Sequence, residues 1–178
     1  MKARIARPAP QALLYGFGAA EAGVRRALEG CGLSVWTAPA GSEQETLTRL
    51  MEAKHPGPSP ESDRRAVIFS GLDARTIGGP INALSGTEAK DALKAVLTPY
   101  NQSWTLAHLL DELEAEHRWM GLARQLEERC KTTPRTPETA PAFAVLERLS
   151  DEQNQPTPQQ LEEALVLLER AGGEGGAQ

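Results

Sequence analysis

Five residues that follow short apolar runs are the best candidates for binding a ligand. They are Gly18, Ser70, Thr98, Asn101 and Trp104. Hydroxyl and amide groups of this kind can recognise a small polar ligand or a peptide backbone, and an indole ring can stack on either. The carboxyl ends of parallel strands meet at one edge of a sheet, so these residues are the candidates for a ligand site there. The alternative is structural, because the same residue types also close turns and anchor helices.

The glycines after the first apolar run are the nearest approach to a cofactor-binding motif. Gly16 and Gly18 stand where a dinucleotide-binding loop places its first two glycines. Glu21 occupies the position of the third glycine, and no Walker lysine follows. The chain also lacks a Gly-x-Ser-x-Gly elbow and the acidic cluster of a phosphate-accepting receiver domain. We therefore interpret the glycines as turn residues and assign no catalytic residue and no cofactor.

One helical segment brings potential metal ligands to four-residue spacing. These residues are His108, Glu112 and Glu116. A zinc-binding His-Glu-x-x-His pattern is missing, so we assign no metal. His117 shares the apolar stripe of the helix with Leu113 and Met120, and we expect it to face the core or a partner.

The composition argues against several classes of partner. The 178 residues carry a formal net charge of -5. Binding to the phosphates of a nucleic acid requires a basic surface, so we expect no nucleic acid partner. No segment approaches the roughly 18 apolar residues that cross a membrane, and Pro8 and Pro10 interrupt the region where a signal peptide would have its core. Cys31 and Cys130 form no Cys-x-x-Cys pair. We expect a soluble, cytoplasmic protein.

Short strands alternating with helices define the expected fold class. Short apolar runs predict strands at 12–17, 66–69 and 94–97, and alternating apolar and polar residues predict one at 33–37. Helical spacing predicts helices at 19–29, from 42, at 87–92 and from 105 to about 120. This alternation indicates an α/β fold: a small, mainly parallel four-stranded sheet in the order 2-1-3-4, with helices on both faces and a C-terminal helical extension.

Changes in composition predict four parts of the chain. They are an N-terminal arm (1–10), an α/β domain (11–121), a helical extension with proline-rich linkers (122–171) and a disordered tail (172–178). Within the extension, Thr157 and Gln160 flank Pro158 in the pattern of a helix N-cap with its capping box. Gly172 and Gly173 are expected to end that helix.

Part of the chain resembles a small bacterial family known as domain of unknown function 3783. The resemblance rests on Val67-Ile68-Phe69-Ser70-Gly71, on Leu93-Lys94-Ala95-Val96-Leu97-Thr98, and on Asn101, Trp104-Thr105-Leu106, Leu109-Leu110-Asp111-Glu112-Leu113 and Glu116-His117. It covers about residues 66–117, and the stretch 78–86 and everything after Gly121 lie outside the pattern. The resemblance implies a shared fold segment and a bacterial cytoplasmic setting, and it implies no reaction.

Two functions fit these observations. The first is a non-enzymatic binding or regulatory module, in which the C-terminal helices contact a protein partner or a second copy of the chain. The alternative is a small-molecule receptor or a small enzyme with its polar site at the carboxyl ends of the strands. A pocket with convergent polar groups at those strand ends would favour the alternative.

Overall fold

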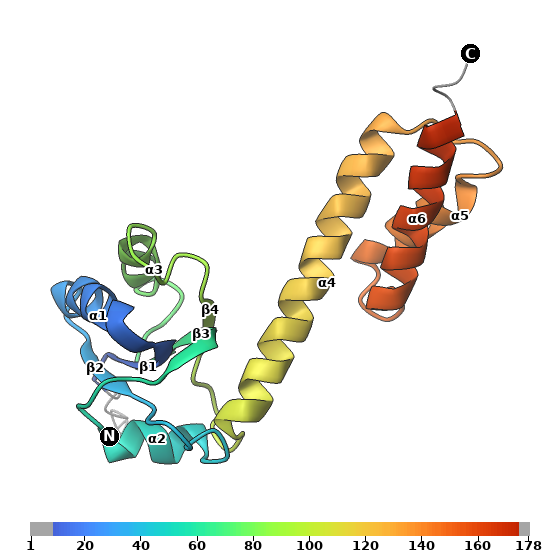
Figure 1. Ribbon diagram of the computed structural model, residues 1–178. Coiled ribbons are helices and arrows are strands. Elements are labelled where there is room, and N and C mark those ends of the chain that lie inside the picture. The colour runs from blue at the N-terminus through green and yellow to red at the C-terminus, as the bar shows by residue number, and fades with distance from the viewer. Residues whose placement is uncertain (1–8, 175–178) are drawn as a thin grey trace, which may run out of the picture. The chain divides into compact units, whose positions relative to one another are not determined.

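The computed structural model describes residues 9–174, which form two compact units that divide between Leu113 and Glu114 (Figure 1). The predicted arm at 1–10 and tail at 172–178 therefore lie largely outside the described residues. The first unit contains four strands, β1 (Gln11–Phe17), β2 (Ser34–Thr37), β3 (Glu61–Ser70) and β4 (Leu93–Val96). Its helices are α1 (Glu21–Gly30), α2 (Leu47–Ala53), α3 (Gly78–Leu84) and the first part of α4 (Leu106–Thr132).

The sheet has the expected strand order but mixed strand directions. The order is β2-β1-β3-β4, and the outer pairs β1–β2 and β3–β4 are parallel. The central pair β1–β3 is antiparallel, so the prediction of a mainly parallel sheet was not accurate. Between β2 and β3 the chain passes through α2 and returns to the end of the sheet where β2 finishes, so β3 starts there and runs in the opposite direction. The backbone N–H of Thr37, at the end of β2, donates to the carbonyl of His55 just before β3 begins (3.0 Å).

Helices cover both faces of the sheet, as the sequence predicts. On β1, Ala12 and Leu14 face α1 and α3, whereas Leu13 and Tyr15 face α2 and α4. Successive residues of a strand point to opposite faces, and all four of these side chains are buried. The unbroken apolar run in β1 therefore reflects a strand with a core on each side.

Strand β3 is longer than its apolar run because the proline-rich segment before it joins the sheet. Phe17 pairs with Glu61, after a bulge that separates Phe17 from Tyr15 in the register. Gly16 sits at this bulge with a φ of 86°, and a Cβ there would lie 2.1 Å from the carbonyl oxygen of Arg64. Only glycine fits such a position, so Gly16 has a structural role.

The second unit consists of the C-terminal part of α4 with α5 (Ala140–Glu147) and α6 (Pro158–Glu174). Its core is separate from the two cores around the sheet and includes Ala123 and Leu126 of α4, Ala142 of α5 and Leu161 of α6. The first turn of α6 is closed as expected: Thr157 Oγ1 accepts from the Gln160 N–H (3.3 Å), and Gln160 Oε1 accepts from the Thr157 N–H (3.0 Å).

Several expectations about helix limits and faces were wrong. No helix forms at 87–92, where the chain makes turns, and α2 begins at Leu47 after the N-cap Thr46 and not from 42. Helix α4 does not end near Met120 but continues through Gly121 to Thr132, since one glycine costs a helix only about 1 kcal/mol. Helix α6 likewise includes Gly172 and Gly173. His117 and Met120 are exposed, because the sheet core ends at Leu113. Among the described residues, no helix is long and apolar enough to cross a membrane.

Candidate functional site

The mixed sheet separates the residues that were expected to form one ligand site. The backbone N–H of Gly18 donates to the carbonyl of Pro60 (3.1 Å), which places Gly18 beside the start of β3. Ser70 ends the same strand and pairs with Gln11. A strand of ten residues is roughly 30 Å long, so Gly18 and Ser70 lie at opposite ends of the sheet. The expected common site is not formed.

The loop around Gly18 is closed by a buried network within the chain. Phe17 donates its N–H to Ser59 Oγ (3.1 Å), and the N–H of Ser59 donates to Glu21 Oε2 (2.5 Å). Arg25 donates to the other carboxylate oxygen of Glu21 (2.7 Å), and Glu21 is 7% exposed. Glu21 thus joins the start of α1 to the loop before β3, which explains why it stands where a dinucleotide fold has glycine.

Thr98 and Asn101 lie at the Ser70 end of the sheet, beyond the last residue of β4. The N–H of Leu97 donates to the carbonyl of Phe69 (2.7 Å) and extends the β3–β4 pairing by one bond. Val96 and Thr98 therefore direct their backbone groups toward the open edge of the sheet. Ser70 is buried beside this pairing, with 6% of its surface exposed.

Asn101 uses its side-chain amide to cover that open edge. Its Nδ2 donates to the carbonyl of Val96 (3.0 Å), and its Oδ1 accepts from the N–H of Thr98 (2.8 Å). A fifth parallel strand would supply the same donor and the same acceptor to these two groups. Asn101 thus takes the place of a strand residue and ends the sheet, a role that leaves little of its amide for a ligand.

Trp104 lies where two helix starts are joined. The N–H of Leu47 in α2 donates to the carbonyl of Trp104 (2.9 Å), and the N–H of Leu106 in α4 donates to the carbonyl of Glu45 (3.0 Å). The free N–H groups at a helix start can bind an anion, but here each helix start donates to the loop before the other. The indole packs against the core and contacts the rings of Tyr100 (centroids 5.2 Å apart) and His108 (4.5 Å).

No group of three His, Cys, Asp or Glu residues in the described part of the chain is placed to hold a metal ion. His108, which the sequence puts in helical register with Glu112 and Glu116, instead lies against the Trp104 ring, with the two ring planes tilted by 57°.

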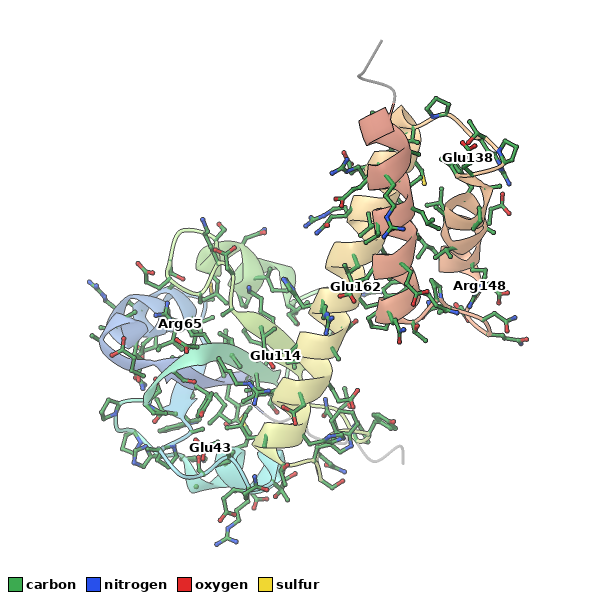
Figure 2. All side chains as sticks on the ribbon, turned by 45° about the vertical axis from the view of Figure 1, so that its right-hand side comes forward. Glu43, Arg65, Glu114, Glu138, Arg148 and Glu162 are labelled. Atoms are coloured by element: carbon green, nitrogen blue, oxygen red, sulfur yellow. The ribbon has the colours of Figure 1, made fainter. Side chains whose placement is uncertain are left out.

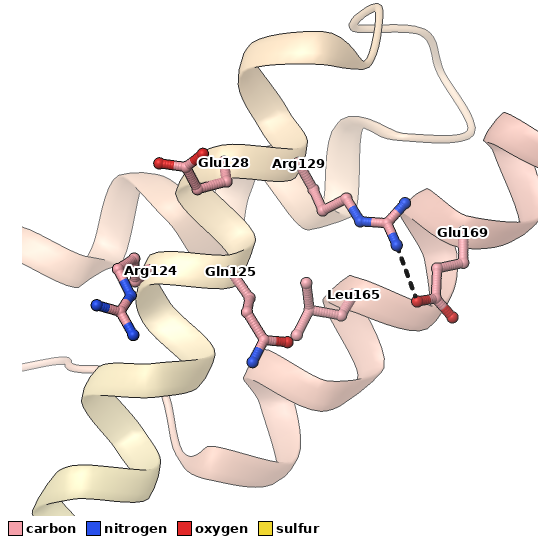
Figure 3. A pocket seen from close by; sticks show the side chains of 6 residues that line it. All are labelled: Arg124, Gln125, Glu128, Arg129, Leu165 and Glu169. Atoms are coloured by element: carbon pink, nitrogen blue, oxygen red, sulfur yellow. Dashed lines mark hydrogen bonds and ion pairs between the residues drawn. The ribbon is translucent and has the colours of Figure 1, made fainter. Parts of the chain in front are cut away.

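The second unit has an open groove of about 440 Å³ between α4 and α6, shown in Figure 3. It is lined by Arg124, Gln125, Glu128 and Arg129 of α4 and by Leu165 and Glu169 of α6. Figure 3 shows the Gln125 and Leu165 side chains next to each other and the ion pair between Arg129 and Glu169 (3.3 Å). Within the described residues, the Arg124 guanidinium and the Gln125 amide make no hydrogen bond or ion pair.

A second groove, of about 250 Å³, lies between α4 and α5. Cys130, Phe143 and Leu146 make it mainly apolar, and Glu127 and Lys131 line it as well. Burial raises the pKa of the Cys130 thiol, so the sulfur stays protonated and is a weak nucleophile at neutral pH. Neither groove was recognised from the sequence. The helical spacing of α4 could have indicated the α4–α6 groove, because positions 124, 125, 128 and 129 lie next to the core residues Ala123 and Leu126 on the helix.

The family comparison concerns the first unit and the start of the second. Residues 65–120 match the model of a family described as a domain of unknown function (DUF3783). The matched segment contains most of β3, all of β4 and the start of α4, and with them the edge-covering Asn101 and Trp104. The groove between α4 and α6 begins at Arg124, beyond the DUF3783 segment. No curated protein and no solved structure matches the chain.

Proposed function

We propose that this protein is a non-enzymatic binding module that acts through protein contacts, and that the α4–α6 groove is its contact surface. The observation that carries the proposal is that two polar groups of this groove, on Arg124 and Gln125, have no partner among residues 9–174. Arg124 and Gln125 line the groove together with Leu165, and Gln125 is the one beside Leu165 (Figure 3), whereas the core of this unit is already filled by Leu126, Leu161 and their neighbours. Packing does not require these two polar groups, so they are available to a partner.

The lining of the groove indicates the chemistry of that partner. Arg124 offers a guanidinium that favours a carboxylate, because such pairs form two parallel hydrogen bonds. Leu165 offers an apolar surface in the same groove, beyond Gln125. A segment that presents an acidic side chain beside an apolar one fits both. The cysteines are unpaired, with Cys31 exposed, which is consistent with the reducing cytoplasm of a bacterial cell as the setting.

A receptor or enzyme site at the strand ends has less support. Gly18 and Ser70 lie at opposite ends of β3, and the amide of Asn101 is bonded to β4. A ligand that needed these groups together would have no place to bind.

Photocrosslinking tests the proposal in the full-length protein. A photoreactive amino acid is placed at Gln125, and a matched one at Glu152, an exposed residue of the same unit outside the groove. We expect position 125, and not position 152, to capture one defined protein from the source cells. That protein, once purified, should bind Arg124→Glu and Leu165→Glu about tenfold more weakly than the unmodified chain. Equal binding to all three chains would contradict the proposal.

A further inference from the structure

The side of α6 that faces away from α4 and α5 carries a second surface, which we call the outer face. It consists of Gln159, Glu163, Val166, Leu167 and Arg170. Val166 is 43% exposed and Leu167 is 36% exposed, and these two are the large apolar residues at its centre. The core positions of α6, Leu161, Ala164 and Leu168, lie on the opposite side of the helix.

The charges on the two sides of α6 differ in their pairing. On the side toward α4, Glu162 pairs with Arg118 (2.6 Å; Glu162 is labelled in Figure 2), and Glu169 pairs with Arg129. On the outer face, Glu163 accepts one hydrogen bond from the Gln159 amide (3.0 Å). Arg170 makes no hydrogen bond or ion pair within the part of the chain that the structure describes.

Glu163 and Arg170 are too far apart to pair with each other. Seven residues of helix separate them by about 10 Å along the axis. Their midpoint falls between Val166 and Leu167, so the acid and the base lie at equal distances on either side of the apolar centre. A face with this arrangement is complementary to itself when it is turned by 180°.

We propose that a second copy of this chain binds the outer face, with the two α6 helices antiparallel about a two-fold axis at Val166 and Leu167. Glu163 of each copy then lies opposite Arg170 of the other, and both ion pairs form at once. The apolar side chains of the two copies cover each other at the centre. This surface is separate from the α4–α6 groove, so dimerisation and partner binding can succeed or fail independently.

A single helix face makes this a small interface, well below the roughly 1,000 Å² of a stable protein complex. The dimer is therefore weak and concentration-dependent. Its two ion pairs are exposed, so added salt weakens it by screening.

Charge exchange tests the proposal in the full-length chain. Glu163→Arg gives an outer face with two cations, and Arg170→Glu gives one with two anions, so each variant alone repels its own copy. When the two variants are mixed, every cation of one lies opposite an anion of the other. All of these side chains are exposed, so the substitutions leave the core intact.

Sedimentation velocity over about a hundredfold range of concentration gives the readout. We expect the unmodified chain to dimerise and each single variant to be at least about tenfold weaker. The mixed variants should form a heterodimer, and Glu152→Arg, a matched charge reversal elsewhere in the same unit, should dimerise like the unmodified chain. A chain that is monomeric at every concentration overturns the proposal, and so does a mixture of variants that associates no better than either alone. Crosslinking at position 125 remains the separate test of the groove.

Discussion

Replacement of Asn101 by alanine tests the role of this residue at the sheet edge. The change removes two hydrogen bonds, from Nδ2 to the Val96 carbonyl (3.0 Å) and from the Thr98 N–H to Oδ1 (2.8 Å). A hydrogen bond in a folded protein contributes about 1 kcal/mol net. Because the freed backbone groups lie at an exposed edge and can bind water, we expect a loss of about 1–2 kcal/mol in the stability of the first unit.

Amide hydrogen exchange measures this loss in the unit that contains Asn101. The buried amides of β3, such as those of Val67 and Ile68, exchange only when the sheet opens, so their protection reports the opening free energy. Gln102→Ala is the matched control, since this neighbouring side chain is exposed and makes no hydrogen bond within the described residues. A loss below about 0.5 kcal/mol for Asn101→Ala, or an equal loss for Gln102→Ala, would refute the edge-covering role.

Three further predictions concern other parts of the fold. Gly16→Ala places a Cβ against the Arg64 carbonyl at a positive φ. We expect the free energy of unfolding, measured by chemical denaturation, to fall by more than about 2 kcal/mol. An unchanged denaturation midpoint would contradict the role of Gly16 at the bulge. Burial of the Tyr15 hydroxyl, and then its hydrogen bond to Glu43, raises the pKa of Tyr15 in the folded protein above its usual 10.0. Folding therefore favours the protonated phenol. The stability that this preference contributes is complete below pH 10 and is lost as the pH rises through the pKa of the folded protein. In Tyr15→Phe the melting temperature should fall less steeply with rising alkaline pH than in the unmodified chain. An equally steep fall in both chains would contradict this prediction. Thr157→Ala removes the N-cap of α6 and should lower stability by about 1 kcal/mol in thermal melts, whereas Thr157→Ser should stay close to the unmodified chain.

Local patterns were sufficient to locate the strands and their order. Short apolar runs marked β1, β3 and β4, an alternating apolar and polar pattern marked β2, and the Thr157 cap marked the start of α6. The direction of β3 was not accessible in this way, because an apolar run reads the same in either direction. The direction of β3 depends on the path of the chain between β2 and β3. This path, which includes α2, brings the start of β3 to the end of the sheet where β2 finishes.

The arrangement of the candidate site could not be predicted from local patterns either. The sequence suggested Asn101 and Trp104 as ligand-binding candidates, but residue type alone does not reveal whether an amide is already bonded to the backbone, as that of Asn101 is. The strand direction decided that Gly18 and Ser70 lie apart. The grooves of the second unit depend on how three helices pack. That packing requires the register of α4 beyond Gly121, where the sequence was assigned to a separate helical extension.

We propose that the α4–α6 groove binds a protein partner. The most direct test of this proposal is the affinity of the partner captured at position 125, measured by titration calorimetry against the unmodified chain and against Arg124→Glu. We predict about tenfold weaker binding for Arg124→Glu and a loss of affinity with added salt, because the guanidinium pairs with a carboxylate of the partner. An affinity that is unchanged by the charge reversal would contradict the assignment of this groove.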